Sequence, residues 1–240
     1  MNSIQLQSVS KTFELGFKKR HGLLARIIGG LSNREQKKEI IVLDTISLTI
    51  KSGEMVGIIG NNGSGKSTLL RIIAGIYRPN SGNIITQGKI ISIINLGSGL
   101  KERLTMKENI FLVGSLFGIS QKTIRENLNS IVHFSGLEQF IDTKIYQFSA
   151  GMLQRLAFSI AIHSNPSILL LDEVFEVGDE NFRKKSTEKI HELVKAGVSV
   201  VFVTHELDMI REHCDRVIWL SNGKICMQGD PEVVVKKYLE

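Results

Sequence analysis

The chain has 240 residues, 42% of them hydrophobic, so it can bury a substantial core as one large domain or as one domain with an inserted lobe. Its formal net charge of +6 fits nucleic acid, anionic lipid or nucleotide as a partner and does not choose among them. No apolar run approaches the ~20 residues that span a bilayer, and no secretory signal opens the chain, so we expect a cytosolic protein.

The N-terminal part of the chain is predicted to be rich in strands. Residues 3–13 alternate between apolar and polar side chains, as a strand with one buried face does. Further strand-like pieces, punctuated by Gly82 and Gly88, stand at Ile41–Leu43, Ile46–Ile50, Met55–Ile59, Ile84–Ile85 and Ile90–Ile94.

A basic insert at about residues 15–40 interrupts this pattern. Lysine and arginine surround five apolar residues whose spacing predicts one face of a short helix: Leu23, Leu24, Ile27, Ile28 and Leu31. Such a helix can lie against anionic headgroups or against a transmembrane partner. The alternative is a solvated loop with a modest helix packed on its own domain.

Helices dominate the middle of the chain, and apolar strands follow them. The pattern is helical from Thr105 to about Asn165, where a proline stops it. Ile168–Leu171 is a fully apolar strand, a charged helix follows at about Glu180–Lys195, and Val198–Val203 is a second apolar strand. Fully apolar strands are typical of a parallel sheet that is buried on both faces.

A hairpin and a short helix are predicted near the C-terminus. Arg216–Ser221 and Lys224–Gln228 flank an Asn-Gly pair, the strongest short hairpin signal, and Pro231 opens the last helix. The two cysteines, Cys214 and Cys226, have no metal-binding spacing and suit a reducing compartment.

The segment Gly60–Thr68 fits the phosphate-binding pattern G-x-x-x-x-G-K-[ST] between a predicted strand and a predicted helix. Its glycines let several N–H groups converge on one phosphate chain, and the helix start adds its positive dipole end. Lys66 is predicted to contact the β- and γ-phosphates, and the Ser67 hydroxyl is predicted to ligate Mg²⁺. The residues predicted to bind nucleotide here are Asn61, Gly63, Gly65, Lys66, Ser67 and Thr68.

Two carboxylates, Asp172 and Glu173, follow the apolar strand Ile168–Leu171. The carboxyl end of a buried strand lies at the ligand edge of an α/β sheet, where the phosphate loop also lies. Asp172 is therefore predicted to organise Mg²⁺, and Glu173 is placed to take a proton from an attacking water.

Ser149 is predicted to cap a helix whose first residues are small, which leaves its N–H groups open to phosphate. The chain carries, in this order, a phosphate loop, this serine/small/glycine helix start, Asp-Glu and a strand ending in Thr204-His205. Together these motifs resemble the ATP-binding subunit of ABC transporters. The resemblance covers nearly the whole chain. It implies an α/β P-loop NTPase core with an antiparallel β subdomain at about 1–100 and 166–240, and an inserted α-helical subdomain at about 101–165.

The resemblance also implies roles for individual residues. It makes Glu173 the general base and His205 the histidine that senses the γ-phosphate. Phe13 matches the aromatic residue that stacks on adenine, although a core phenylalanine is the alternative. Other residues would act across a dimer: Ser149 and Gly151 would contact the γ-phosphate held by the other subunit, and Asp179 would cross the interface.

Some positions depart from the common family pattern. Most members carry a glutamine in the loop between the two lobes, and none stands at the expected place here. Asn95 keeps an amide there but is shorter by one methylene, so we consider it with Ser67 and Asp172 as a metal candidate. The stretches around Asn95 and at Phe148–Met152 resemble the polysaccharide exporters of O-antigen, teichoic acid and capsule.

The sequence thus predicts an ATP-hydrolysing subunit that powers the export of a lipid-linked, O-antigen-like polysaccharide. It would use ATP and Mg²⁺, form a homodimer, and act with a separate transmembrane permease, itself in two copies. We expect it at the cytoplasmic face of the bacterial inner membrane, in peripheral contact with the bilayer and without nucleic acid. No carbohydrate-binding domain is expected after Glu240, where the chain ends.

Other functions stay open at this point. The subunit could serve the export of teichoic acid, capsule, lipid, peptide or a drug. A soluble ABC protein of translation or DNA repair is a second alternative, although such proteins usually carry tandem ATPase units or a long coiled coil. A nucleotide-binding module without turnover is a third, and an ATPase assay separates it from the others.

Overall fold

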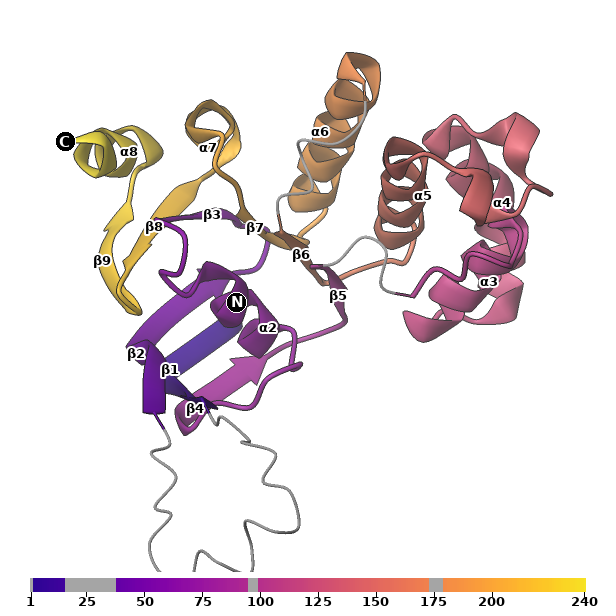
Figure 1. The fold of residues 1–240 in the computed structure, drawn as a ribbon. Coiled ribbons are helices and arrows are strands. Elements are labelled where there is room, and N and C mark those ends of the chain that lie inside the picture. Colours follow the sequence, from indigo (N-terminus) through magenta and orange to yellow (C-terminus); the bar gives the residue numbers. More distant parts are fainter. Residues whose placement is uncertain (1, 16–37, 95–98, 173–178) are drawn as a thin grey trace, which may run out of the picture.

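The computed structural model describes residues 2–15, 38–94, 99–172 and 179–240, and these residues form two sheets with helices around them (Figure 1). The smaller sheet is antiparallel, with the strand order β2-β1-β4. Its strands are β1 (Asn2–Leu15), β2 (Lys38–Lys51) and β4 (Ser81–Thr86).

The larger sheet has the strand order β5-β6-β7-β3-β8-β9 and is parallel except for β9. In chain order its strands are β3 (Met55–Ile59), β5 (Ile90–Ile93), β6 (Ile168–Asp172), β7 (Ser199–Val203), β8 (Arg216–Ser221) and β9 (Lys224–Gly229). Every residue of β3 and β7 is buried. This is the environment that the fully apolar runs predict.

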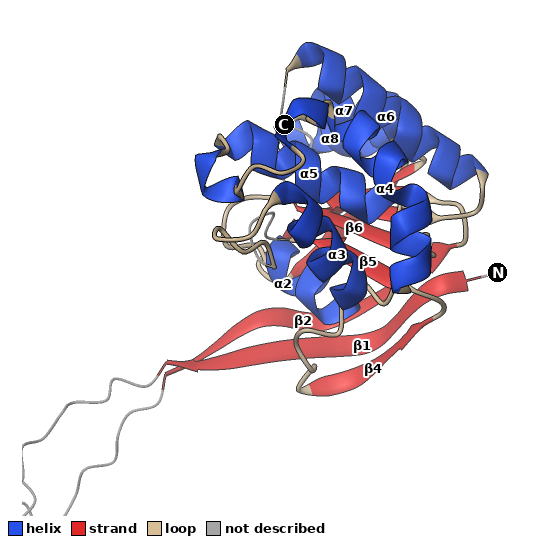
Figure 2. Cartoon of the chain, turned by 90° about the vertical axis from the view of Figure 1, so that its right-hand side faces the viewer, coloured by secondary structure: helices blue, strands red, loops and turns tan. Residues whose placement is uncertain are grey.

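The core lies on both faces of the parallel sheet, because alternate residues of each strand point to opposite sides. On β6, Leu169 and Leu171 belong to one buried cluster, while Ile168 and Leu170 belong to the other. Helix α2 (Lys66–Ile73) contributes to the second cluster together with the antiparallel sheet. Helices α6 (Glu180–Lys195), α7 (Leu207–His213) and α8 (Pro231–Leu239) contribute to the first, and Figure 2 shows these layers.

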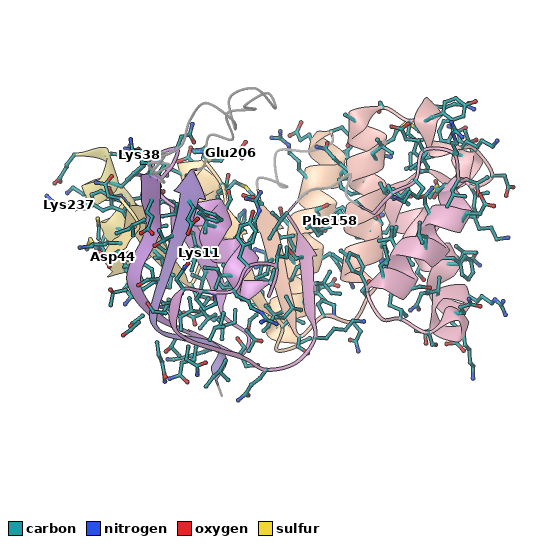
Figure 3. The ribbon with its side chains drawn as sticks, turned by 60° about the horizontal axis from the view of Figure 1, so that its bottom comes forward. Lys11, Lys38, Asp44, Phe158, Glu206 and Lys237 are labelled. Atoms are coloured by element: carbon teal, nitrogen blue, oxygen red, sulfur yellow. The ribbon has the colours of Figure 1, made fainter. Side chains whose placement is uncertain are left out.

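Three further helices form a layer with a core of its own at one side of the molecule (Figure 1). They are α3 (Met106–Leu116), α4 (Gln121–Ser135) and α5 (Ala150–Ile162), with the short 3-10 helices η1 (Glu138–Phe140) and η2 (Ile145–Gln147) between them. Thr105 and Glu108 form a capping box at the start of α3. Phe158 of α5, labelled in Figure 3, joins this layer to the rest, since its ring centroid lies 6.0 Å from that of Phe182 on α6.

The structure confirms the α/β fold class and differs from the sequence prediction in two places. Ile41–Leu43 and Ile46–Ile50 belong to one strand, β2, whose regular alternation is broken at Thr45 by a positive φ of 56°. The ends of the predicted insert at 15–40 are also strand, because β1 reaches Leu15 and β2 begins at Lys38. Residues 16–37, with the predicted helical face, lie outside the described residues.

No helix in the described part of the chain has the length and apolar character that crossing a bilayer requires.

The two cysteines are free thiols: Cys226 is exposed, and Cys214 is half-buried. Cys214 packs against β3, where an added Cβ on Gly57 would come within 2.8 Å of its sulfur. Burial raises the pKa of the Cys214 thiol, so it stays protonated and unreactive near neutral pH.

Arg216 joins the two sheets. From the start of β8, its guanidinium lies 2.7 Å from a carboxylate oxygen of Glu54 and donates to the backbone oxygen of Thr49 on β2 at 2.6 Å. The Arg216 and Glu54 side chains are only 22% and 13% exposed. A charge pair so shielded from water depends strongly on having both partners.

Replacing Arg216 with Met keeps the apolar stem and leaves the Glu54 carboxylate without this partner. We expect the free energy of unfolding, measured by urea denaturation, to fall by roughly 2–4 kcal/mol. The matched control is Lys224→Met, which removes an exposed pair with Asp44 and should change stability little. Because the Lys224–Asp44 pair also joins the two sheets, equal losses in the two variants would contradict the greater importance that we assign to the shielded Arg216 contacts.

Candidate functional site

The register of the parallel sheet brings three strand ends to one edge. Val203 of β7 pairs with Ile58 of β3 on one side and with Asp172 of β6 on the other. The chain continues from these strands into the loop that begins at Gly60 and into His205. Strands β3, β7 and β6 are neighbours in the sheet (Figure 1). The loop, the histidine and Asp172, all predicted from the sequence as site residues, therefore lie at the same edge of the sheet.

The loop between β3 and α2 folds around the ammonium group of Lys66. Its Nζ atom donates to the backbone oxygen of Gly60 at 2.6 Å and to that of Asn61 at 3.1 Å. The residue is only 6% exposed, and the backbone N–H of Ser64 also donates to the oxygen of Asn61, at 3.1 Å. This buried ammonium group is a positive charge that can attract an entering anion.

The turn of the β8–β9 hairpin supports this loop. Gly223, in the turn, donates its N–H to the backbone oxygen of Ser64 at 3.1 Å and accepts from the N–H of Asp44 at 2.8 Å. Gly60 has a φ of +149°, and a Cβ there would lie 2.1 Å from the backbone oxygen of Leu220 on β8. The first glycine of the motif is therefore required by the close approach of β8 as well as by the loop's own shape.

The start of α2 is ready for an anion. Its first turn carries no acidic residue, and Gly65 at the N-cap supplies no side-chain cap. The Oγ atom of Ser64 is buried without a hydrogen-bond partner among the described residues. Open N–H groups at a helix start, a buried ammonium group and an orphaned hydroxyl fit the phosphate chain of a nucleotide. Ser67 and Thr68 follow, both half-buried.

Thr204 and His205 differ in their surroundings at the end of β7. Thr204 is buried, and its hydroxyl accepts a hydrogen bond from the N–H of Glu206 at 3.0 Å. The His205 side chain is exposed at the edge of the sheet. Asp172 is half-buried at the end of β6. Two predicted site residues, Glu173 and Asn95, lie outside the described residues.

Ser149 caps α5, as the sequence predicts, by accepting the N–H of Met152 at 3.2 Å. Gly151 faces open space, since a Cβ there would have one neighbour within 4 Å, the Ser149 Oγ at 4.0 Å. In Figure 1, α5 lies in the helical layer, apart from α2 and its loop. One copy of the chain therefore does not bring Ser149 and Gly151 to its own phosphate loop.

Arg155 connects helix α5 to Asp179, a contact that the sequence analysis does not predict. It donates to the backbone oxygens of Ser135 and Gly136, at 2.9 and 3.2 Å, and to the carboxylate of Asp179 at 3.2 Å. Asp179 in turn caps α6 by accepting the N–H of Phe182 at 2.9 Å. The one available signal is that Arg155 is the single charged residue of α5.

Phe13 belongs to a small aromatic group beside α2. Its ring meets that of Tyr77 edge-on, with the centroids 5.5 Å apart, and the Nζ of Lys11 lies 5.1 Å from its centroid. Lys11, labelled in Figure 3, also donates to the backbone oxygen of Arg78 at 2.8 Å. Phe13 is only half-buried, so the stacking of its ring on adenine stays a prediction.

Comparisons with known proteins place this site in context. The family described as ABC transporter matches residues 43–176. The chain is 41% identical over 217 residues to the O-antigen export system ATP-binding protein RfbB of Myxococcus xanthus, which covers 90% of this chain and 50% of that protein. It is 38% identical to an RfbB of Klebsiella pneumoniae, covering 84% of this chain and 82% of the relative. The chain thus spans half the length of the Myxococcus relative and most of the Klebsiella one.

Two other comparisons extend these findings. The teichoic acids export ATP-binding protein TagH of Listeria monocytogenes is 38% identical, over 99% of this chain and 70% of that protein. Among solved structures, a dimeric ATP-binding cassette in a post-hydrolysis state with ADP and Pi has a TM-score of 0.76 at 27% identity. That match covers 95% of this chain and 98% of the cassette.

Replacing Arg155 with Met should leave the backbone oxygens of Ser135 and Gly136 without this donor and free the Asp179 carboxylate. We expect urea denaturation to show a loss of roughly 1–3 kcal/mol in the free energy of unfolding. Amide exchange at the start of α6 should become faster, because its cap loses support. Lys189→Met, which removes an exposed pair with Glu192, is the control and should have little effect on either measurement. Unchanged exchange at α6 in Arg155→Met would count against the proposed link.

Proposed function

Because the chain belongs to the ABC transporter family, we propose that it is the ATP-hydrolysing subunit of an exporter of lipid-linked polysaccharide. The observation that carries the substrate class is 38% identity to the Klebsiella O-antigen export protein over 84% of this chain and 82% of that protein. The departures from the common motifs at Phe148–Met152 and around Asn95 agree with this branch of the family.

ATP would bind with its phosphate chain in the loop Gly60–Thr68. To reach the β- and γ-phosphates, the Lys66 ammonium group must leave the carbonyls of Gly60 and Asn61, which hold it at 2.6 and 3.1 Å. A charged phosphate oxygen attracts the ammonium group more strongly than either of these carbonyl oxygens does. Phe13, beside Tyr77, is the residue we assign to adenine.

The residues near the loop also suit Mg²⁺, which usually keeps several waters and takes few protein ligands besides phosphate oxygens. Ser67, at the start of α2, and Asp172, at the end of β6, would hold it, with Asn95 as a further candidate. When bound, the ion would neutralise charge on the phosphates.

Hydrolysis needs a base for the attacking water, and we assign this role to Glu173. It directly follows Asp172, whose strand pairs with β7. His205, beyond the end of β7, is the residue we assign to sensing the γ-phosphate. Its exposed position allows it to contact a ligand that lies along this edge of the sheet.

A second copy of the chain would complete the site. Helix α5, which Ser149 caps, lies apart from α2 within one copy (Figure 1), and an open helix start is suited to a γ-phosphate presented from outside. The similarity to a cassette described as dimeric supports this arrangement. Since ADP lacks the γ-phosphate, only ATP would hold the two copies closed, and hydrolysis would release them. Asp179, next to Arg155, would lie at the interface.

The cycle of closing and opening would act on a separate transmembrane permease, in two copies, through which the lipid-linked polysaccharide passes. We place the subunit at the cytoplasmic face of the bacterial inner membrane, in peripheral contact with the bilayer. Teichoic acid is the second candidate cargo, because the TagH protein of Listeria monocytogenes is 38% identical over 99% of this chain.

Lys66→Ala should weaken ATP binding by at least about tenfold, because the point charge on the phosphates is lost. The measurement is the dissociation constant for ATP, by calorimetry or with a fluorescent analogue. Lys89→Ala is the matched control: Lys89 is half-buried and donates to the backbone oxygen of Ser164 at 2.8 Å, away from the loop. Near-unchanged affinity in Lys66→Ala would remove the loop from the proposal.

Glu173→Gln should bind ATP normally yet hydrolyse it about 10²-fold or more slowly, because an amide cannot accept the proton. With ATP the variant should accumulate as a dimer in light scattering, and with ADP it should not. Glu180→Gln, in the exposed first turn of α6, is the control for loss of a nearby carboxylate. Wild-type turnover in Glu173→Gln would remove the general-base assignment.

The cargo can be tested by purifying the subunit with its endogenous membrane partner and identifying the bound glycolipid by mass spectrometry. An O-antigen-type lipid-linked polysaccharide is the expected result. A teichoic-acid precursor would favour the second candidate, and a partner without any glycan would contradict both.

A further inference from the structure

The last helix of the chain reaches the phosphate loop. At the end of α8, the hydroxyl of Tyr238 donates to the side-chain oxygen of Asn61 at 3.0 Å. The two residues stand 177 positions apart in the chain. No motif of the loop includes a residue of α8, so the sequence analysis assigns this tyrosine no role.

The position of α8 is well determined by its own contacts. Asp230 caps it by accepting the N–H groups of Glu232 and Val233, at 3.0 and 3.2 Å. Val234 and Val235 are fully buried at 0% exposure in the core that covers one face of the parallel sheet. A capped helix with a buried face presents its last turn at a defined place. The Tyr238 hydroxyl is therefore held against the loop.

The ring of Tyr238 is held as well. It meets Trp219 of β8 edge-on, with centroids 5.5 Å apart and an interplanar angle of 77°. Trp219 pairs in register with Ile59, the last residue of β3 before the loop. The ring and the hydroxyl thus contact two adjacent parts of the same structure, the end of β3 through Trp219 and the loop through Asn61.

Asn61 joins these contacts to the lysine of the loop. Its backbone oxygen accepts from the Lys66 Nζ and from the Ser64 N–H, both at 3.1 Å, while its side-chain oxygen accepts from Tyr238. When Lys66 turns to the phosphates, its bond to Asn61 is lost. The bond from Tyr238 does not involve the lysine and can keep the first turn of the loop in its curled shape.

We propose that Tyr238 is a positioning residue for nucleotide binding: through Asn61 it holds the phosphate loop in the shape that receives ATP, and it links α8 to the occupancy of the site. This inference rests on the proposed function, since it takes the loop as the nucleotide site. It adds a residue and an element, α8, that neither the loop motif nor the family pattern includes.

Tyr238→Phe removes the hydroxyl and keeps the ring on Trp219. We expect the dissociation constants for ATP and ADP to rise about threefold to tenfold, as the loss of one hydrogen bond produces, with an unchanged melting temperature. The KM for ATP should rise by the same factor, while kcat should change little, because Tyr238 touches no reacting atom. Tyr146→Phe is the matched control, since that exposed hydroxyl accepts from its chain neighbour Gln147.

Asn61→Ala removes the same hydrogen bond from its other end, on an exposed side chain. If the two residues act through their contact, adding Tyr238→Phe to Asn61→Ala should weaken ATP binding no further. Effects that multiply in the double variant would overturn the proposal. This comparison of the two single variants with the double variant remains a test of the proposal if one single variant proves less stable than expected.

Trp219 gives a direct readout, because it is the single tryptophan of the chain. Its emission should shift when ATP is titrated into the wild type, and the shift should be smaller in Tyr238→Phe. A wild type that binds no ATP would overturn the proposed function. A wild type that binds ATP, with Tyr238→Phe binding equally well and giving the same emission shift, would overturn only the role of Tyr238.

Discussion

The parallel pairing of β6 and β3 with β7 is the constraint on which the rest of the site depends. Asp172, Val203 and Ile58 are paired side by side near the ends of these three strands. This pairing brings the phosphate loop, the histidine after β7 and the carboxylate of β6 to one edge of the sheet. These strands are buried on both faces, so a slip of one residue would move every side chain of a strand into the wrong cluster. The hydrophobic core thereby determines the register, and the register places the chemical groups.

Long polar side chains then fix the other elements relative to this edge. Arg216 holds the antiparallel sheet to the parallel one, and Arg155 holds helix α5 to the start of α6. Both act through charge-assisted hydrogen bonds. Those of Arg216 lie in a shielded position, where such bonds are stronger than in water, whereas the Asp179 partner of Arg155 is 60% exposed. The phosphate loop itself is supported by the β8–β9 turn and by Tyr238, so its shape is shared between its own glycines and distant parts of the chain.

Much of the fold is readable from the sequence, because the features that specify it are local. The apolar runs Met55–Ile59 and Ile168–Leu171 are strands of a buried parallel sheet, and the Asn-Gly pair is the turn of the C-terminal hairpin. The charged helix begins at Glu180 and ends at Lys195, as its pattern indicates. The split of β2 into two pieces is one of the two errors, because a positive φ at Thr45 shifts the alternation while the strand continues.

The sequence by itself determined which chemical groups the candidate site contains, because its glycine-rich lysine loop, its carboxylate after a buried strand and its serine at a helix start belong to short contiguous motifs. Only the tertiary structure decided which groups meet. It put β7 between β3 and β6, tied Arg155 to Asp179, and brought Tyr238 to Asn61. Such pairs depend on how separate elements pack, and a single sequence carries no periodicity or spacing that marks a contact between residues far apart along the chain.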